Sequence, residues 1–191
     1  LDTPLGLNPE LTLSTITRAQ RFDELDFVFP LRPDDGEAIK AKEIGALMSQ
    51  FPGPGLPKGY GEMLSRLNFL PVRGFMVGSV DLIFEHAGRW YVVDYKSNNL
   101  GSHASDYSAS HLAEAMSHSH YVLQYHIYSL ALHRYLSYRL GERYRFDDHF
   151  GGVLYLFMRG MSPDYAPSTG IFSDRPPREL IEGMSALLGG P

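Results

Sequence analysis

Apolar and polar residues alternate along three short stretches of the first hundred residues, as they do in half-buried β-strands. In the stretch 21–31, every second residue from Leu25 onward is apolar. Two further stretches, rich in β-branched and aromatic residues, flank His86-Ala87-Gly88-Arg89. Glycine supplies the positive φ that a tight hairpin turn requires. The pattern therefore predicts one strand followed, after an interval, by a β-hairpin that runs from Gly78 to Lys96.

Apolar residues at helical spacing predict four helices, and a short apolar run predicts a further strand. The helices are expected at residues 34–50, 62–67, 111–140 and 177–188, and the strand at 152–158. Residues 1–20, 51–61 and 160–175 are expected to be irregular, because proline, glycine and polar residues interrupt their periodicity. Apolar residues lie on both faces of the predicted hairpin. We therefore expect an α/β fold with a central mixed β-sheet flanked by helices on both faces.

The hairpin register places two carboxylates side by side. With Ala87-Gly88 as the turn, Asp81 lies opposite Asp94, and Lys96 shares their face because side chains alternate along a strand. The opposite face, which includes Val80 and Tyr95, is apolar. Like charges directly opposite each other destabilise a sheet by about 0.2–1 kcal/mol, and Mg²⁺, which prefers carboxylate oxygens, removes this conflict.

Lys96 is then placed to orient or deprotonate a water molecule, or to stabilise charge on a phosphate. The pattern thus predicts a metal-dependent phosphodiesterase site. An exposed Asp–Lys ion pair on a half-polar sheet face is the alternative interpretation.

Other polar residues are candidates for the same site. The long predicted helix carries a stripe in which Gln124 and Tyr128 are hydrogen-bond donors, although such a stripe also suits a helix core. Glu24 and Asp26 lie on the polar face of the first strand, where either is a third acid of the site or part of an exposed edge. His126 and His133 are seven residues apart rather than the four usual for helical metal ligands, so we interpret them as surface histidines.

A local group of basic residues lies in the last turns of the long predicted helix and just after it. Four arginines, at 134, 139, 143 and 145, either contact nucleic acid or cover a solvated helix end. The net charge of −5 argues against a surface that coats nucleic acid generally. It is compatible with a nuclease, whose carboxylates are balanced by metal ions.

Composition narrows the class of protein further. The 191 residues are enough for one domain with a sizeable core, and the 43% hydrophobic content excludes general disorder. The absence of cysteine excludes disulfides, thiolate zinc sites and iron–sulfur clusters in this chain, and fits a reducing, cytoplasmic location. The chain opens on Leu1-Asp2 rather than methionine, so we expect a single domain excised from a longer protein.

Four motifs together resemble one known family. The motifs are Gly78-Ser79-Val80-Asp81, Asp94-Tyr95-Lys96-Ser97-Asn98, the helix at 121–136 with its Gln124-x-x-x-Tyr128, and the segment 149–160. They resemble the nuclease domains of the RecB family, part of the bacterial helicase–nuclease RecBCD (exonuclease V). The resemblance extends from about Glu24 to the C-terminal helix.

The resemblance implies a restriction-endonuclease-like PD-(D/E)xK core, with the motif reduced here to Asp-x-Lys. It implies that Asp81, Asp94 and the Tyr95 carbonyl bind Mg²⁺, for which Mn²⁺ or Ca²⁺ substitutes. It also implies that Lys96 is catalytic. By the same resemblance, Gln124 and Tyr128 belong to the site, and Glu24 occupies the position of a further acid.

The resemblance further implies an exodeoxyribonuclease that acts in double-strand break repair and recombination on a single strand of DNA delivered by a helicase. The implied partners are the RecC and RecD subunits and the RecA recombinase. The family also has an upstream helix with a Gly-x-x-x-His metal ligand, whereas no histidine precedes Glu24 here. We therefore expect an excised C-terminal fragment without that helix, with weak or no cleavage. A module that docks RecA or partner subunits is the alternative function.

Overall fold

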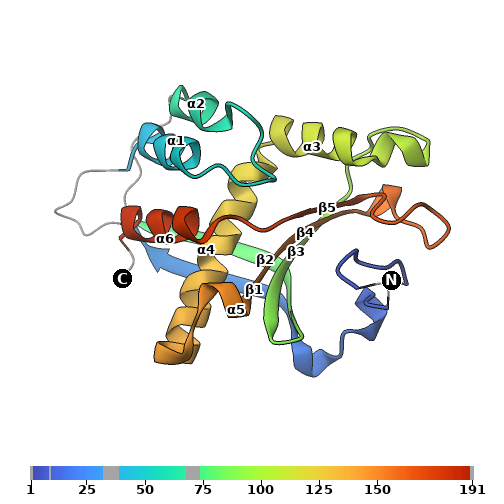
Figure 1. Ribbon diagram of the computed structural model, residues 1–191, viewed down its shortest axis with the longest axis horizontal. Helices are drawn as coiled ribbons and strands as arrows, with labels where there is room; N and C mark the ends of the chain where they lie inside the picture. Colours follow the sequence, from blue (N-terminus) through green and yellow to red (C-terminus); the bar gives the residue numbers. More distant parts are fainter. Residues whose placement is uncertain (1, 9, 32–38, 68–73, 190–191) are drawn as a thin grey trace.

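A computed structural model describes residues 2–8, 10–31, 39–67 and 74–189. In this part of the chain, five strands form one mixed sheet in the order β1-β2-β3-β4-β5 (Figure 1). The strands are β1 (Arg21–Pro30), β2 (Phe75–His86), β3 (Arg89–Lys96), β4 (Phe150–Phe157) and β5 (Ile171–Asp174). Neighbouring strands are antiparallel, except that β3 and β4 are parallel. The mixed sheet confirms the predicted α/β class.

Six α-helices accompany the sheet in the described residues. They are α1 (Ala41–Gln50), α2 (Tyr60–Ser65), α3 (Ala109–His118), α4 (Tyr121–Leu140), α5 (Phe146–His149) and α6 (Arg178–Leu187). Short 3₁₀ turns are η1 (Leu13–Thr15), η2 (Arg18–Gln20), η3 (Ala104–Tyr107), η4 (Gly141–Arg143) and η5 (Met158–Gly160). Among these described helices, none combines the length and apolar character needed to cross a bilayer.

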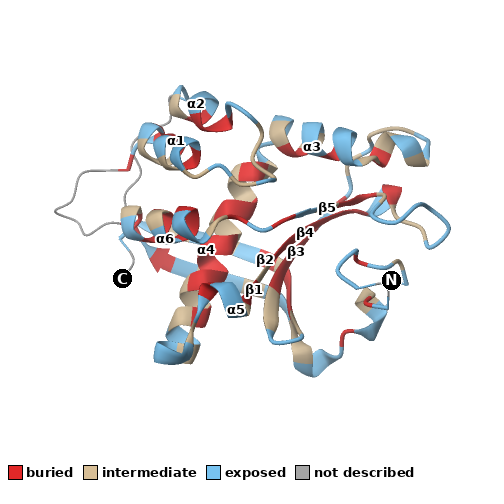
Figure 2. Cartoon of the chain, in the orientation of Figure 1, coloured by how far each residue is buried: buried red, intermediate tan, exposed pale blue. Residues whose placement is uncertain are grey.

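The two faces of the sheet are covered by different parts of the chain. One face packs against α4, with α6, α1 and α2 beyond it, and burial is concentrated along α4, β3 and β4 (Figures 1 and 2). The other face packs against Leu5, Leu11 and Ile16 of the N-terminal segment. In the described residues, this second face is therefore covered by an irregular segment that includes the 3₁₀ turns η1 and η2, rather than by an α-helix.

The hairpin register is confirmed over its closed end. Leu82 pairs with Val93, and the ladder continues to His86 and Arg89. The turn residues Ala87 and Gly88 have φ of 51° and 80°, the two positive values that a type I′ hairpin turn requires.

Three predicted elements need correction. The single helix expected at 111–140 is two helices, because His120 adopts φ of 55° between α3 and α4. Residues 160–175 were expected to be irregular but contain β5, an edge strand of four residues paired with β4. The first helix begins at Ala41 rather than at residue 34; Ile39 and Lys40 are not helical, and residues 34–38 lie outside the described part.

Both histidines of α4 are buried, so their prediction as surface residues was wrong. His126 is fully buried, stacks on Tyr125, and donates from Nδ1 to the Val122 carbonyl at 2.7 Å. The Nδ1 atom of His133 lies 3.0 Å from the Tyr144 hydroxyl. Burial lowers the pKa of each imidazole to about 4, so both rings are neutral at physiological pH. Both side chains project from α4 into the packed core.

The four arginines at the end of α4 and just after it have different surroundings. Arg134 donates to the Ser185 hydroxyl and carbonyl, at 3.1 and 2.9 Å, and its guanidinium covers the Phe29 ring. It therefore joins α4 to α6. Arg139 and Arg143 are exposed, and Arg145 donates to nearby backbone carbonyls.

The buried histidines predict a loss of stability in acid. Unfolded histidine binds a proton below about pH 6.5, whereas folded His126 resists protonation to about pH 4. The unfolded state therefore binds more protons in this window, and stability falls as the pH decreases through it. We expect His126→Phe to remove about 2–3 kcal/mol of the loss between about pH 7 and about pH 4.5, measured by urea denaturation.

Exposed His118 provides the matched control, because His118→Phe should leave the pH dependence as in the wild type. The buried carboxyls Asp94 and Asp174 have raised pKa values and act in the opposite direction, so only the difference between variants is diagnostic. Equal acid destabilisation of His126→Phe and wild type would contradict the expectation.

Candidate active site

The C-terminal end of β3 carries the Asp-x-Lys motif between two packed layers. Asp94 and Lys96 point to the α4 side of the sheet, where each is at most 9% exposed. Lys96 Nζ lies 2.6 Å from Asp94 Oδ2, so the two form a buried ion pair. This burial excludes the alternative interpretation of an exposed Asp–Lys pair. An ion pair withdrawn from water costs desolvation energy, which its surroundings must offset.

Helix α4 supplies those surroundings. Lys96 Nζ donates to Gln124 Oε1 at 2.9 Å, and Gln124 Nε2 donates to the Tyr128 hydroxyl at 2.9 Å. The ammonium also lies 3.8 Å from the centre of the Tyr121 ring, within the range of a cation–π interaction. The spacing of three and four residues on one helix explains why Tyr121, Gln124 and Tyr128 meet the same lysine.

One residue of this network was not assigned a role from the sequence. The Tyr155 hydroxyl on β4 donates to Gln124 Oε1 at 3.1 Å, beside the Lys96 bond. Tyr155 is the parallel-strand partner of Asp94. No spacing rule could have found it, because the parallel pairing of β3 and β4 joins segments about sixty residues apart. The sequence signals that include Tyr155 were the apolar run at 152–158 and the motif at 149–160, and neither indicated contact with Gln124.

Asp81 lies at the point where β2 separates from its neighbour. The β2–β3 ladder ends at Leu82 and Val93, so Asp81 and Asp94 are not the ladder pair that the register predicted. Instead, the Tyr95 N–H donates to Asp81 Oδ2 at 2.9 Å. The carboxylate of Asp81 thus replaces a backbone acceptor, and it still lies next to the Asp-x-Lys motif.

The strand also changes face at this position. Val80 packs in the α4-side core with Ile83, whereas Leu82 packs in the opposite core. The alternation is therefore interrupted at Asp81. The expectation that Val80 and Tyr95 share one apolar face was wrong for this physical reason.

The hydrogen bond of Tyr95 also fixes the direction of its carbonyl. In a β-strand, the N–H and C=O of one residue point to the same side of the strand. Because the Tyr95 N–H faces Asp81 on β2, its carbonyl oxygen faces the same gap between β2 and β3. A carboxylate and a carbonyl therefore line this gap together.

Glu24 on β1 lies opposite Asp81 in the sequence of strand pairs, but its side chain does not join Asp81 and Asp94. The pairs Asp23–Leu82 and Leu25–Val80 flank it, while Glu24 and Asp81 are left out of the β1–β2 ladder. Glu24 has φ of 53° and is exposed, as is Asp26. Within the described residues, no three histidine, aspartate or glutamate side chains converge as a metal site. The third acid stays a prediction.

The electrostatics of the site oppose a free negative charge. Burial raises the pKa of Asp94, the neighbouring Asp81 raises it further, and Lys96 partly compensates. Burial together with the charges of Asp94 and Asp81 also raises the pKa of Tyr128 and of Tyr155. Asp94 Oδ2 is buried, and its recorded partner within the described residues is the Lys96 ammonium at 2.6 Å.

These observations match what a divalent cation requires. A buried carboxylate, a second carboxylate and a backbone carbonyl are hard oxygen ligands of the type Mg²⁺ and Ca²⁺ take. The residues present therefore fit a cation, with fewer protein ligands than a closed site.

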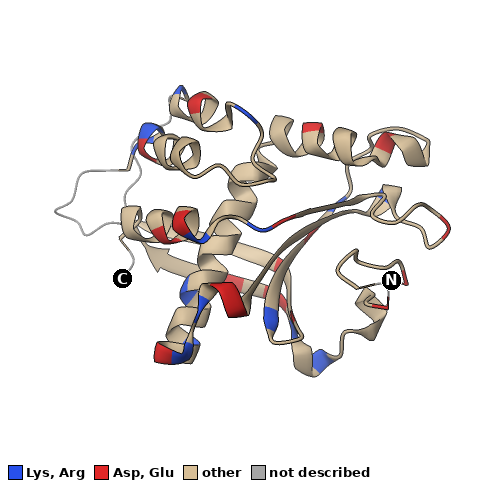
Figure 3. Ribbon diagram, in the orientation of Figure 1, with Lys and Arg blue, Asp and Glu red and all other residues tan. Residues whose placement is uncertain are grey.

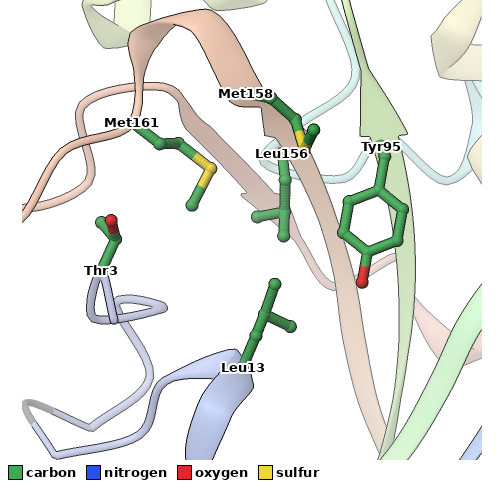
Figure 4. A pocket seen from close by; sticks show the side chains of 6 residues that line it. All are labelled: Thr3, Leu13, Tyr95, Leu156, Met158 and Met161. Atoms are coloured by element: carbon green, nitrogen blue, oxygen red, sulfur yellow. The ribbon is translucent and has the colours of Figure 1, made fainter. Parts of the chain in front are cut away.

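The side chain of Tyr95 points away from this cluster. It lines an apolar cavity of about 500 Å³ on the opposite face of the sheet, with Leu156, Met158 and Met161 (Figure 4). Thr3 and Leu13 of the N-terminal segment close the other side of this cavity. The two faces of β3 thus serve a polar site and an apolar interface respectively.

The mixed sheet and the Asp-x-Lys motif at the end of β3 are the features expected of the PD-(D/E)XK nuclease superfamily. Residues 43–181 match the family model of the PD-(D/E)XK nuclease superfamily, and the chain belongs to that superfamily. Proteins similar to this chain include RecB subunits of the RecBCD enzyme from several bacteria, and the chain is a RecB-like PD-(D/E)XK nuclease domain.

Three relatives illustrate the similarity. The RecB subunit of Escherichia coli K12 is 38% identical over 192 residues, which cover all of this chain and 15% of that protein. RecB of Mycolicibacterium smegmatis is 41% identical over 98% of this chain and 19% of its own length. RecB of Haemophilus influenzae is 51% identical over 63% of this chain and 10% of its own length. The chain thus spans less than a fifth of each of these relatives.

The shared amide of Gln124 predicts unequal effects of two conservative substitutions. Gln124→Leu keeps the volume but removes one hydrogen-bond partner from each of Lys96, Tyr155 and Tyr128, so we expect a loss of about 2–3 kcal/mol in unfolding free energy. Tyr128→Phe removes only the outer end of the network and should cost about 1 kcal/mol or less. Chemical denaturation of the two variants measures the difference, and equal losses would show that Gln124 is not the centre of the network.

Proposed function

We propose that this domain hydrolyses phosphodiester bonds of single-stranded DNA in a reaction that depends on Mg²⁺. The observation that carries the proposal is the buried Asp94–Lys96 pair, which lies beside Asp81 at the gap between β2 and β3. Burying two charges carries a desolvation cost that an apolar pair would avoid, and a catalytic role would explain why the pair is present.

The proposed roles follow from what each residue contacts. Asp81, Asp94 and the Tyr95 carbonyl would hold the cation, and Glu24 would join them only if β1 moved toward the gap. A bound divalent cation would polarise the scissile phosphate and lower the pKa of an attacking water molecule. Lys96, held by Gln124 over the Tyr121 ring, would place positive charge at the phosphate.

Gln124 and Tyr128 position the lysine in this proposal rather than touching the substrate. Hydrolysis breaks the bond between phosphorus and the 3′ oxygen, so the product carries a 5′-phosphate. The oxygen that leaves takes up the proton released by the attacking water, directly or through solvent.

The similarity to RecB supports a setting within a helicase–nuclease. In this proposal a helicase delivers the strand, RecC and RecD are neighbouring subunits, and double-strand break repair and recombination in the cytoplasm are the context. Basic and acidic positions are interspersed along the described chain (Figure 3). DNA would therefore be held by local contacts near the site rather than by one broad basic face.

Loss of Asp94 is the direct test of the proposed exonuclease. The assay uses the natural full-length protein. We expect Asp94→Ala to lower its rate of Mg²⁺-dependent hydrolysis of single-stranded DNA by at least about a hundredfold. Asp164→Ala, which removes an exposed carboxylate in the loop before β5, is the matched control and should retain the wild-type rate. Equal rates for Asp94→Ala and wild type would refute the catalytic assignment.

Metal binding by the chain alone should be weak, because two carboxylates and one carbonyl converge in its described residues. We expect titration with Mn²⁺ to raise the thermal unfolding temperature of the wild type and not that of Asp81→Asn. In the absence of metal, Asp81→Asn should be more stable than wild type by up to about 1 kcal/mol, because it relieves the repulsion by Asp94. Robust cleavage by this chain alone would contradict the expected shortage of ligands.

An exposed apolar strip supports the second candidate function, a docking module. Val28, Phe75 and Val77 lie together on β1 and β2 and are 64%, 68% and 69% exposed. Contiguous exposed apolar residues mark protein-binding surfaces. The candidate partners are RecA and the neighbouring subunits.

A pull-down with RecA separates the two functions. We expect Val77→Asp to weaken capture of RecA several-fold, because it places a charge in the apolar strip. Lys96→Ala and Tyr138→Asp, the latter at the far end of α4, should capture RecA as wild type does. Capture that depends on Lys96 and not on Val77 would contradict docking at this strip.

A further inference from the structure

We propose that Arg159 binds a second phosphate of the DNA strand, beside the phosphate that is hydrolysed. This inference rests on the proposed nuclease function and assigns one contact of its substrate. The ligand is a phosphodiester anion, and the contact positions the strand without reading its sequence.

The location of Arg159 follows from the parallel pairing of β3 and β4. Parallel strands end at the same edge of a sheet, so the segments that follow Lys96 and Phe157 emerge together. Arg159 lies in η5 directly after β4, and its Nε donates to the Ser97 carbonyl at 2.9 Å. Ser97 is three residues beyond Asp94, which is about 10 Å along an extended strand. That distance suits a phosphate one or two nucleotides from the scissile one.

A polar cavity of about 250 Å³ lies at this position. Its lining includes Arg159, His103, Asn99, Ser102 and Tyr165, all capable of hydrogen bonding. This lining contrasts with the apolar cavity beneath Tyr95 on the other face. A small polar hollow with an arginine is suited to an anion rather than to a nucleobase or an apolar side chain.

Arg159 is anchored by one guanidinium nitrogen, and its other two nitrogens are available to a ligand. Its Nε is occupied by Ser97, and no protein acceptor within the described residues is recorded for its two terminal nitrogens. Arg159 is exposed, so these nitrogens are open to solvent. A guanidinium fixed at Nε presents its remaining donors as a fork, which matches two phosphate oxygens.

Neighbouring contacts make the hollow rigid. A Cβ at Gly160 would overlap the Tyr107 ring, so η5 lies directly against that ring. The Tyr107 hydroxyl accepts a hydrogen bond from the Leu100 N–H at 3.2 Å. The adjacent carboxylate of Asp106 is engaged by the His103 N–H at 2.8 Å. The loop after the catalytic strand and the turn after β4 therefore form one preorganised unit.

Three variants test the phosphate contact without depending on cleavage. The assay measures binding of the full chain to a fluorescent oligothymidylate in Ca²⁺ over a series of salt concentrations. We expect Arg159→Gln, which keeps a donor for Ser97 but loses the charge, to weaken binding about tenfold. It should also make the slope of log K against log salt shallower by about 0.7, the value for one contact to single-stranded DNA.

Arg159→Lys keeps the charge and should keep the wild-type salt slope with intermediate affinity. Arg139→Gln removes the same charge near the end of α4, about 22 Å along the helix from Gln124, and should change neither quantity. A salt slope for Arg159→Gln equal to that of wild type would overturn the inference. The inference would also fail if Arg159→Gln lowered the thermal unfolding temperature while the salt dependence of DNA binding stayed as in wild type.

The outcome also separates this inference from the function on which it rests. If wild type fails to bind the oligonucleotide at all, both fail together. If wild type binds, and Asp94→Ala abolishes cleavage while Arg159→Gln retains full affinity, only the phosphate contact is refuted.

Discussion

The buried ion pair between Asp94 and Lys96 is the constraint on which the rest of the site depends. Two opposite charges two residues apart on one strand must share a face, and here that face is the interior beneath α4. Their desolvation is offset by the amide of Gln124 and the ring of Tyr121, both of which come from the first turns of α4. The position and rotation of α4 are therefore tied to β3 by polar contacts as well as by apolar packing.

The same strand must satisfy a second core. Tyr95, between the two charged residues, points into the opposite layer with Leu156 and the N-terminal segment. Side chains of β3 are therefore packed on both faces of the sheet. Along one edge, β3 also pairs in parallel with β4 (Phe150–Phe157). Such a strand cannot slip in register without moving every charged and apolar side chain to the wrong face. Precision at the site thus comes from the double burial of β3.

Much of this arrangement could be predicted from local pattern. The hairpin turn, the register at Leu82–Val93, and the shared helix face of Gln124 and Tyr128 all follow from periodicity and turn chemistry. What could not be predicted depends on long-range pairing or on unusual backbone. Tyr155 joins the site only because β4 lies beside β3, and His126 is buried only because other elements cover α4 on that side. The break at His120 uses a left-handed conformation that residues other than glycine adopt infrequently.

The departure at Asp81 is the most informative of these, because it changes how the acids are brought together. A regular ladder would hold Asp81 and Asp94 as facing pleat positions. Instead, both ladders of β2 lapse at Asp81, Glu24 opposite it takes a left-handed conformation, and the Asp81 carboxylate accepts the Tyr95 N–H. The irregularity opens a gap into which the Tyr95 carbonyl also points. Irregular backbone at this position thus turns a hairpin with two acids into a gap lined by carboxylate and carbonyl oxygens, since a regular sheet would use that carbonyl in its own hydrogen bonding.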